Sequence, residues 1–166
     1  KASFSLITLA LMRISCSMFH IAQVNIGRML APLDSPTMAG FMARLADINA
    51  LADSAPGFVW RLQTESGDAT SVRVFDDDRM MLNMSVWDSI EALWNFSYKT
   101  EHAPVISGRT QWFERLSTPY MALWWIPAGN LPTPQDAKMR LQLLEQQGAT
   151  AEAFTFKARF PMPQSE

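Results

Sequence analysis

The chain has 166 residues, 48% of them hydrophobic, which is enough for one ordinary domain with a buried core. Its 14 basic and 16 acidic residues give a net charge of −2, so no basic stripe is available to bind nucleic acid or an anionic membrane. A single cysteine cannot form an internal disulfide, and the two histidines give no zinc-ligand spacing. We therefore predict a cytoplasmic protein without a metal site.

Residues 1–17 are predicted to be an extension that lies outside a single domain spanning residues 18–163. The apolar run at residues 4–12 resembles the core of a signal peptide, but it is too short to span a bilayer. Arg13 interrupts the run, and no small-residue cleavage site follows it. Export as a lipoprotein through Cys16 is the alternative.

The first half of the domain has the pattern strand, helix, strand. Residues 19–26 alternate in polarity, which predicts a strand. Ser35 is the expected cap of a helix with Pro36 at its first position, and apolar residues then recur at helical spacing up to Pro56. Residues 58–63 alternate again and predict a second strand, which a polar loop follows.

The second half begins with a strand that runs almost directly into a helix. Residues 82–87 alternate and predict the third strand, and Asp88 and Glu91 stand at capping-box spacing for the helix. A second helical piece is expected over residues 101–113. The aromatic run at residues 120–126 predicts a fourth strand that is buried on both faces.

Two further elements are expected after this strand. Thr133, Pro134 and Asp136 form the signature of a helix start, and Gly148 is a suitable stop. Residues 154–157 predict a short closing strand. The order β-α-β-β-α-β with an appended helix and strand predicts an α+β fold, a ferredoxin-like antiparallel sheet with helices on one face.

The aromatic content suggests that this fold associates with a second copy. Six tryptophans and ten phenylalanines are more than one small core easily buries. A sheet with helices on one side leaves its other face bare, and a large apolar face of this kind usually marks an interface. We therefore expect a symmetric homodimer in which two sheets pair face to face.

Several short motifs occur together in a specific order. They are Asp47-Ile48-Asn49-Ala50-Leu51-Ala52, Pro56-Gly57-Phe58-Val59-Trp60-Arg61-Leu62, Asn83-Met84-Ser85-Val86-Trp87, His102, Trp112-Phe113 and Leu123-Trp124-Trp125-Ile126-Pro127-Ala128-Gly129. With these motifs the chain resembles, over roughly residues 19–163, the bacterial domain-of-unknown-function family numbered 3291. The resemblance implies a dimeric α+β barrel. That superfamily also includes antibiotic-biosynthesis-type monooxygenases and haem-binding or haem-degrading proteins, but the family carries no reaction that transfers to this chain.

His102 is the first candidate for a catalytic residue. A histidine can act as a general base, donate a hydrogen bond or ligate haem axially, as a helical histidine does in haem-binding members of the superfamily. Packing at a helix start beside Tyr98 and Glu101 is the structural alternative. No cofactor is predicted, and haem is retained only by analogy with those members.

Asn25 and Asn83 are the other catalytic candidates, because they lie on strand faces opposite the apolar stripes. A buried amide needs a hydrogen-bond partner, which can be a ligand carbonyl or a neighbouring loop. Trp60, Trp87 and Trp125 are candidates for lining a pocket around a flat ligand. The alternative is that these tryptophans fill the core or the dimer interface.

Arg61 and Arg109 can each bind a carboxylate through two parallel hydrogen bonds. A salt bridge to an internal acid such as Glu114 is the alternative for both. Tyr98 completes the candidate ligand-binding residues. The acidic run at residues 76–78 lacks calcium-loop spacing and is expected to be a solvated turn.

The sequence has no glycine-rich phosphate loop, no GxSxG elbow and no HExxH motif, so classical hydrolases and nucleotide enzymes are disfavoured. Three functions stay open. The leading one is a homodimer that binds a small apolar or aromatic ligand. The second is a cofactor-independent enzyme of monooxygenase or isomerase type, with His102 as base and Asn25 or Asn83 as donor. The third is a structural dimer without a ligand.

Overall fold

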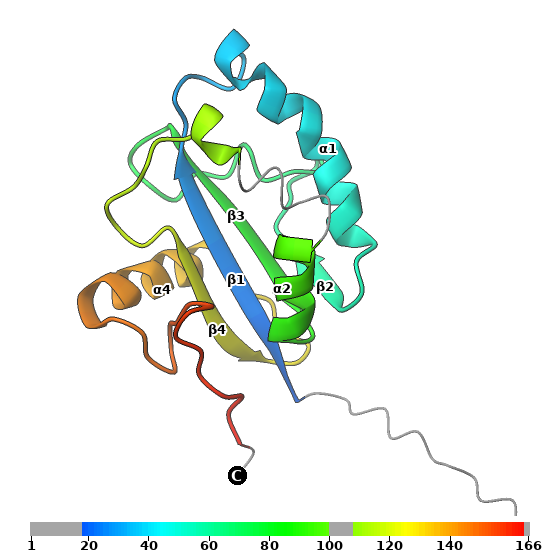
Figure 1. The fold of residues 1–166 in the computed structure, drawn as a ribbon, viewed down its shortest axis with the longest axis vertical. Coiled ribbons are helices and arrows are strands. Elements are labelled where there is room, and N and C mark those ends of the chain that lie inside the picture. Colours follow the sequence, from blue (N-terminus) through cyan, green and yellow to red (C-terminus); the bar gives the residue numbers. More distant parts are fainter. Residues whose placement is uncertain (1–17, 100–107, 165–166) are drawn as a thin grey trace, which may run out of the picture.

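The computed structural model describes residues 18–99 and 108–164. Its strands are β1 (Phe19–Arg28), β2 (Phe58–Arg61), β3 (Met80–Trp87) and β4 (Met121–Pro127). Its α-helices are α1 (Ala39–Asp53), α2 (Ile90–Lys99) and α4 (Pro134–Gln147), and its short 3-10 helices are η1 (Pro36–Met38) and η2 (Arg109–Gln111). The strands form one antiparallel sheet in the order β2-β3-β1-β4 (Figure 1), which is the ferredoxin-like order. The predicted α+β fold class is confirmed.

One face of the sheet is apolar over the middle of its strands. Six residues of β1 and β3 on this face are at most 7% exposed: Ala22, Val24, Ile26, Leu82, Met84 and Val86. Helix α4 packs Ala137, Leu141 and Leu144 against them, whereas α1 and α2 lie on the opposite side of the sheet (Figure 1). The expectation of a bare sheet face is therefore wrong, because the appended helix covers that face within the chain.

The opposite face changes from apolar to polar along the strands. Ile21 pairs with Trp87 at the apolar end, where both pack with Leu93 and Phe96 of α2. The ring of Trp87 stacks on that of Phe96, with centroids 4.9 Å apart. Helix α2 therefore covers the apolar end of this face, and the polar residues further along β1 lie outside this aromatic cluster.

The close packing of the start of β2 against the start of α2 depends on a glycine. Gly57 has a φ of +79°, and a Cβ atom there would lie 2.5 Å from the Cβ of Ala92 and from Oδ1 of Asp88. The amide of Asp88 also donates to the carbonyl of Gly57 at 2.8 Å. Only glycine allows β2 to begin this close to the start of α2.

The helix starts agree with the sequence at α4 and differ at α1 and α2. Thr133 and Asp136 form the predicted capping box. Ser35, by contrast, makes no capping hydrogen bond. Ser89 replaces Asp88 as the cap of α2, since its hydroxyl accepts the Ala92 N–H at 3.2 Å.

Two predicted elements are reduced to short contacts. Residues 154–157 do not form a strand; Phe154 alone bridges to Leu123 of β4, through backbone hydrogen bonds of 2.8 and 2.9 Å. The helical piece expected over residues 101–113 is represented by η2, and residues 101–107 lie outside the described part of the chain.

Candidate functional site

A cavity of about 250 Å³ lies between the partly polar face of the sheet and helices α1 and α2. Its floor comes from β1 and β3 and consists of Gln23, Asn25, Asn83, Ser85 and Trp87. Its helical walls are formed mainly by Phe41, Leu45, Ile48, Ala52, Leu93, Phe96, Ser97 and Tyr98. An apolar hollow with a few convergent polar groups is typical of a small-molecule site.

The centre of the floor is a chain of three buried side chains. The indole N–H of Trp87 donates to the Ser85 hydroxyl at 2.9 Å, and this hydroxyl donates to the side-chain carbonyl of Gln23 at 2.9 Å. The indole can only donate, so the hydroxyl is free to direct its own hydrogen toward Gln23. The amide nitrogen of Gln23 is then left to donate to other groups, and Gln23 lines the cavity.

Asn25 and Asn83 lie directly opposite each other in the β1–β3 register. Both line the cavity; Asn25 is half-buried and Asn83 is exposed. Side chains directly opposite in antiparallel strands have Cβ atoms about 5 Å apart. The two amides are therefore close enough to contact one small polar group of a ligand.

The far end of the cavity is closed by aromatic side chains that follow η2. Phe113 packs directly over Gly27 of β1, where a Cβ atom would lie 2.7 Å from Cδ1 of the phenylalanine. Trp112 is buried, and both it and Phe113 contact the ring of Phe41 on α1. The missing side chain of Gly27 thus allows this wall to approach the sheet.

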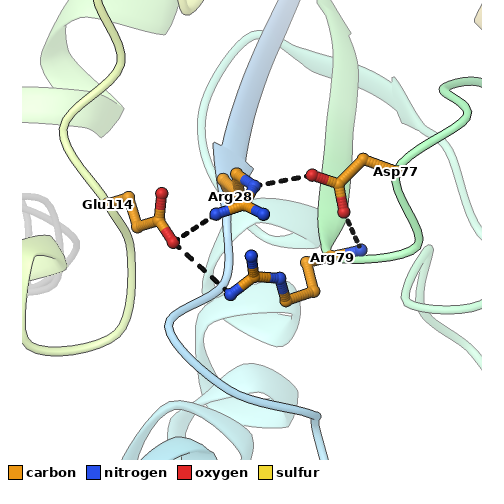
Figure 2. A network of polar contacts seen from close by, with 4 residues as sticks. All are labelled: Arg28, Asp77, Arg79 and Glu114. Atoms are coloured by element: carbon orange, nitrogen blue, oxygen red, sulfur yellow. Dashed lines mark hydrogen bonds and ion pairs between the residues drawn. The ribbon is translucent and has the colours of Figure 1, made fainter.

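A cluster of charged residues holds the segment after η2 against β1. Figure 2 shows Arg28 between the carboxylates of Asp77 and Glu114, and Arg79 reaching Glu114. The nitrogen–oxygen distances are 2.6 Å from Arg28 to Asp77, 2.5 Å from Arg28 to Glu114 and 3.5 Å from Arg79 to Glu114. The hydrogen bonds that Arg28 donates to Asp77, and next to Glu114, raise the pKa of its guanidinium. Backbone hydrogen bonds between residues 28–30 and 112–114 complete the attachment.

Three arginines line the cavity and differ in their partners. Arg61 is held by both oxygens of Asp53, at 2.8 and 3.1 Å, and by the carbonyl of Gly67 at 2.8 Å. Arg109 stacks over the ring of Tyr120 at 4.4 Å and makes one long hydrogen bond, 3.4 Å, to the carbonyl of Ile26. Arg44 is exposed and donates to a carbonyl of its own helix. Arg61 therefore has the structural role that the sequence left as an alternative.

Tyr98 stands at the rim of the cavity on the last turn of α2. Its ring packs on Trp94 and Phe156, with centroid distances of 4.3 and 5.7 Å. Partial burial raises the pKa of its hydroxyl, with a smaller contribution from Tyr120. Tyr98 therefore stays neutral at physiological pH and can donate a hydrogen bond.

The structure brings six of the predicted site residues to this cavity: Asn25, Arg61, Asn83, Trp87, Tyr98 and Arg109. Trp60 pairs with Val86 and packs on the side of α4, away from the cavity. Trp125 also does not line it, and its indole donates to the carbonyl of Phe160 at 3.0 Å. His102 lies outside the described residues, so we assign no histidine ligand for haem.

Sequence reasoning missed Gln23 and Ser85, although they form the centre of the floor. Both sit on the alternating face that carries Asn25 and Asn83, and this shared face was the available signal. What the sequence does not give is the register, which makes the two side chains partners.

Among residues 18–99 and 108–164, no cluster of histidine, cysteine and acidic side chains could hold a metal ion. In the same part of the chain, no helix is both long and apolar enough to cross a membrane.

A family model described as "Domain of unknown function (DUF3291)" matches residues 20–166 of the chain. No curated protein matches the chain.

Solved structures with a similar fold include SnoaB from Streptomyces nogalater, described as a cofactor-independent oxygenase. SnoaB is 17% identical, the match covers 69% of this chain and 97% of that one, and the TM-score is 0.45. The NE2512 protein of unknown function from Nitrosomonas europaea is 12% identical over 70% of this chain and 96% of that one, with a TM-score of 0.42. PA3566 from Pseudomonas aeruginosa is 14% identical over 70% and 99%, with a TM-score of 0.44. Similarity at this level carries no argument about function.

Proposed function

Because the chain belongs to the DUF3291 family, whose description names no function, we propose a function from the cavity: the protein binds a small, largely apolar or aromatic molecule between the sheet and helices α1 and α2. The observation that carries this proposal is an apolar cavity of about 250 Å³ with a polar floor. An engineered cavity of about 150 Å³ holds benzene, so this volume suits a ligand of one or two rings.

Replacing two alanines of α1, one at a time, by leucine tests the proposal. Ala52 is 8% exposed and lines the cavity, whereas Ala50 is exposed on the same helix. Ala52→Leu should fill part of the cavity and weaken binding of a two-ring aromatic probe at least about tenfold, a change of ~1.4 kcal/mol. Ala50→Leu should bind like the unmodified protein. Equal binding by both variants, measured calorimetrically, would place the ligand elsewhere.

The facing amides of Asn25 and Asn83 favour an enzyme as the second candidate. Preorganised donors on a cavity floor can stabilise an oxyanion that forms when a base removes a proton from the ligand. In this reading the chain is a cofactor-independent enzyme of monooxygenase or isomerase type, and His102 is the base. Its test is a substrate whose turnover is lost in His102→Ala while ligand binding and the melting temperature are retained.

The family resemblance implies a homodimer, and we include one in the proposal. It would not use the apolar sheet face, which α4 covers within the chain. Large hydrophobic side chains that are exposed outside that face are candidates for interface residues; Met18, Leu131 and Met139 are 62%, 54% and 45% exposed. Light scattering should give twice the 18.7 kDa of one chain. A cytoplasmic location is proposed on composition alone, and cell fractionation tests it.

A further inference from the structure

The charged side chains that line the described part of the cavity are all arginines. Arg44, Arg61 and Arg109 line it, and none of the described lining residues is aspartate or glutamate. Of these three, Arg61 is paired with Asp53, which does not line the cavity, and nearby Arg28 is paired with Asp77 and Glu114. Within residues 18–99 and 108–164, the charged side chains that line the cavity are therefore all positive.

Among the described residues, Arg44 and Arg109 are the two lining arginines without an ion pair, and Arg109 is the less exposed of the two. It is half-buried, and within residues 18–99 and 108–164 it forms no ion pair. Its guanidinium lies over the ring of Tyr120, with Cζ 4.4 Å from the ring centroid, and donates one long hydrogen bond of 3.4 Å to the carbonyl of Ile26. Stacking in this way leaves N–H groups at the edge of the guanidinium for a second partner. A cation removed from water is stabilised when an anion binds it.

Because of the position of Arg109, the two ends of the cavity differ in polarity. The carbonyl that it contacts follows Asn25, so the guanidinium lies at the Asn25–Asn83 part of the floor. The apolar end at Trp87 is four residues further along the strands, a separation of about 13 Å. A molecule that uses both ends has an apolar body and one charged or polar head.

We infer that the ligand is an apolar or aromatic carboxylic acid, and that Arg109 binds its carboxylate beside Asn25 and Asn83. The inference rests on the proposed function, because it names the class of ligand for the same cavity. Arg61 takes no part, since Asp53 binds one edge of its guanidinium and the carbonyl of Gly67 binds the remaining nitrogen. Arg44 takes no part either, because its guanidinium donates to the carbonyl of Gly40 on its own helix and lies over the ring of Trp112.

Two probes of the same shape test the charge. Calorimetry with 2-naphthoate and 2-naphthamide compares a carboxylate with a neutral amide on one ring system. The unmodified protein should bind the carboxylate at least about tenfold more tightly, and Arg109→Gln should lose this preference. Arg109→Lys should keep part of it, because lysine retains the charge but not the paired hydrogen bonds. Arg73→Gln, which removes a positive charge from an exposed residue outside the cavity, should keep all of it.

The outcomes separate the inference from the function on which it rests. Equal binding of both probes by the unmodified protein would overturn the inference that the ligand is a carboxylic acid, while the cavity would still be a binding site. A preference that persists in Arg109→Gln would overturn the role of this residue. Binding of neither probe would overturn the proposed function as well. If Arg109→Gln fails to fold, as judged by its melting temperature, Arg109→Lys takes its place in the test. A preference for the carboxylate that is undiminished in Arg109→Lys would contradict paired hydrogen bonds from Arg109.

Discussion

The hydroxyl of Ser85 donates a 2.9 Å hydrogen bond to the side-chain carbonyl of Gln23, across the central pair of strands and on the floor of the cavity. Both residues are buried, at 8% and 5% exposed, and the same hydroxyl accepts the indole N–H of Trp87. The contact therefore links the polar centre of the floor to its aromatic end, and it fixes the direction in which the amide of Gln23 points.

Removing this hydroxyl should destabilise the protein. Ser85→Ala leaves the indole of Trp87 and the carbonyl of Gln23 without their partner, and an unsatisfied buried polar group costs about 1–3 kcal/mol. Ser97→Ala is the control, because Ser97 is equally buried on α2 and makes no hydrogen bond to this group. Urea unfolding should give a clearly larger loss for Ser85→Ala. Equal losses would mean that the chain of hydrogen bonds has no energetic role.

The approach of Phe113 to β1 should make Gly27 hard to replace. In Gly27→Ala the new methyl group would lie 2.7 Å from the phenylalanine ring, so the wall of the cavity must move, at a cost of about 1–3 kcal/mol. Gly40→Ala, on α1, meets its nearest atoms at 3.4 Å and should be neutral or slightly stabilising. Thermal melts compare the two variants. A Gly27→Ala protein as stable as Gly40→Ala would show that the wall is loosely packed.

The charged cluster of Figure 2 should affect ligand binding indirectly. Glu114→Gln removes the acid shared by Arg28 and Arg79, and these side chains help to hold the segment that carries Arg109 and Phe113. We expect a lower melting temperature and weaker binding in low salt, and a smaller difference in 1 M salt because partly exposed ion pairs are screened. A difference that does not depend on salt would point to packing instead of charge.

The capping box of α4 should contribute to stability in a pH-dependent way. Hydrogen bonds from the Thr133 backbone and side chain lower the pKa of Asp136, so the stabilisation is present above the unfolded-state pKa of about 4 and is lost as the pH falls through the lower folded-state pKa. Asp136→Asn should therefore be less stable than the unmodified protein at pH 7 and approach it below pH ~3. Thr133→Ala should cost about 1 kcal/mol at pH 7. Parallel stability curves over this range would contradict the assignment.

The sequence predicted most of the fold because its signals are local. Alternating residues gave the strands, and Thr133 with Asp136 and Gly148 marked the ends of α4. At α2 the pattern pointed to Asp88 as the cap, but the neighbouring Ser89 takes that role. When two adjacent residues both have capping side chains, the sequence alone does not tell which of them is the cap.

The docking side of α4 was not predictable in the same way. Its apolar stripe indicates that the helix packs on something, but a stripe does not say on which face of the sheet. The same limit applies to the cavity. Asn25 and Asn83 could be selected because they lie on the strand faces opposite the apolar stripes, whereas Trp60 and Trp125 were candidates by residue type alone. Their positions follow from strand register and from tertiary packing.

The most direct test of a ligand between the sheet and helices α1 and α2 is to follow the six indole N–H signals by nuclear magnetic resonance during a titration with 2-naphthoate. Trp87 and Trp112 line the cavity, whereas Trp60 and Trp124 pack on the face covered by α4. The signals of Trp87 and Trp112 should move in a saturable way while those of Trp60 and Trp124 stay fixed. Shifts confined to Trp60 and Trp124, or no shifts at all, would contradict a binding site in this cavity.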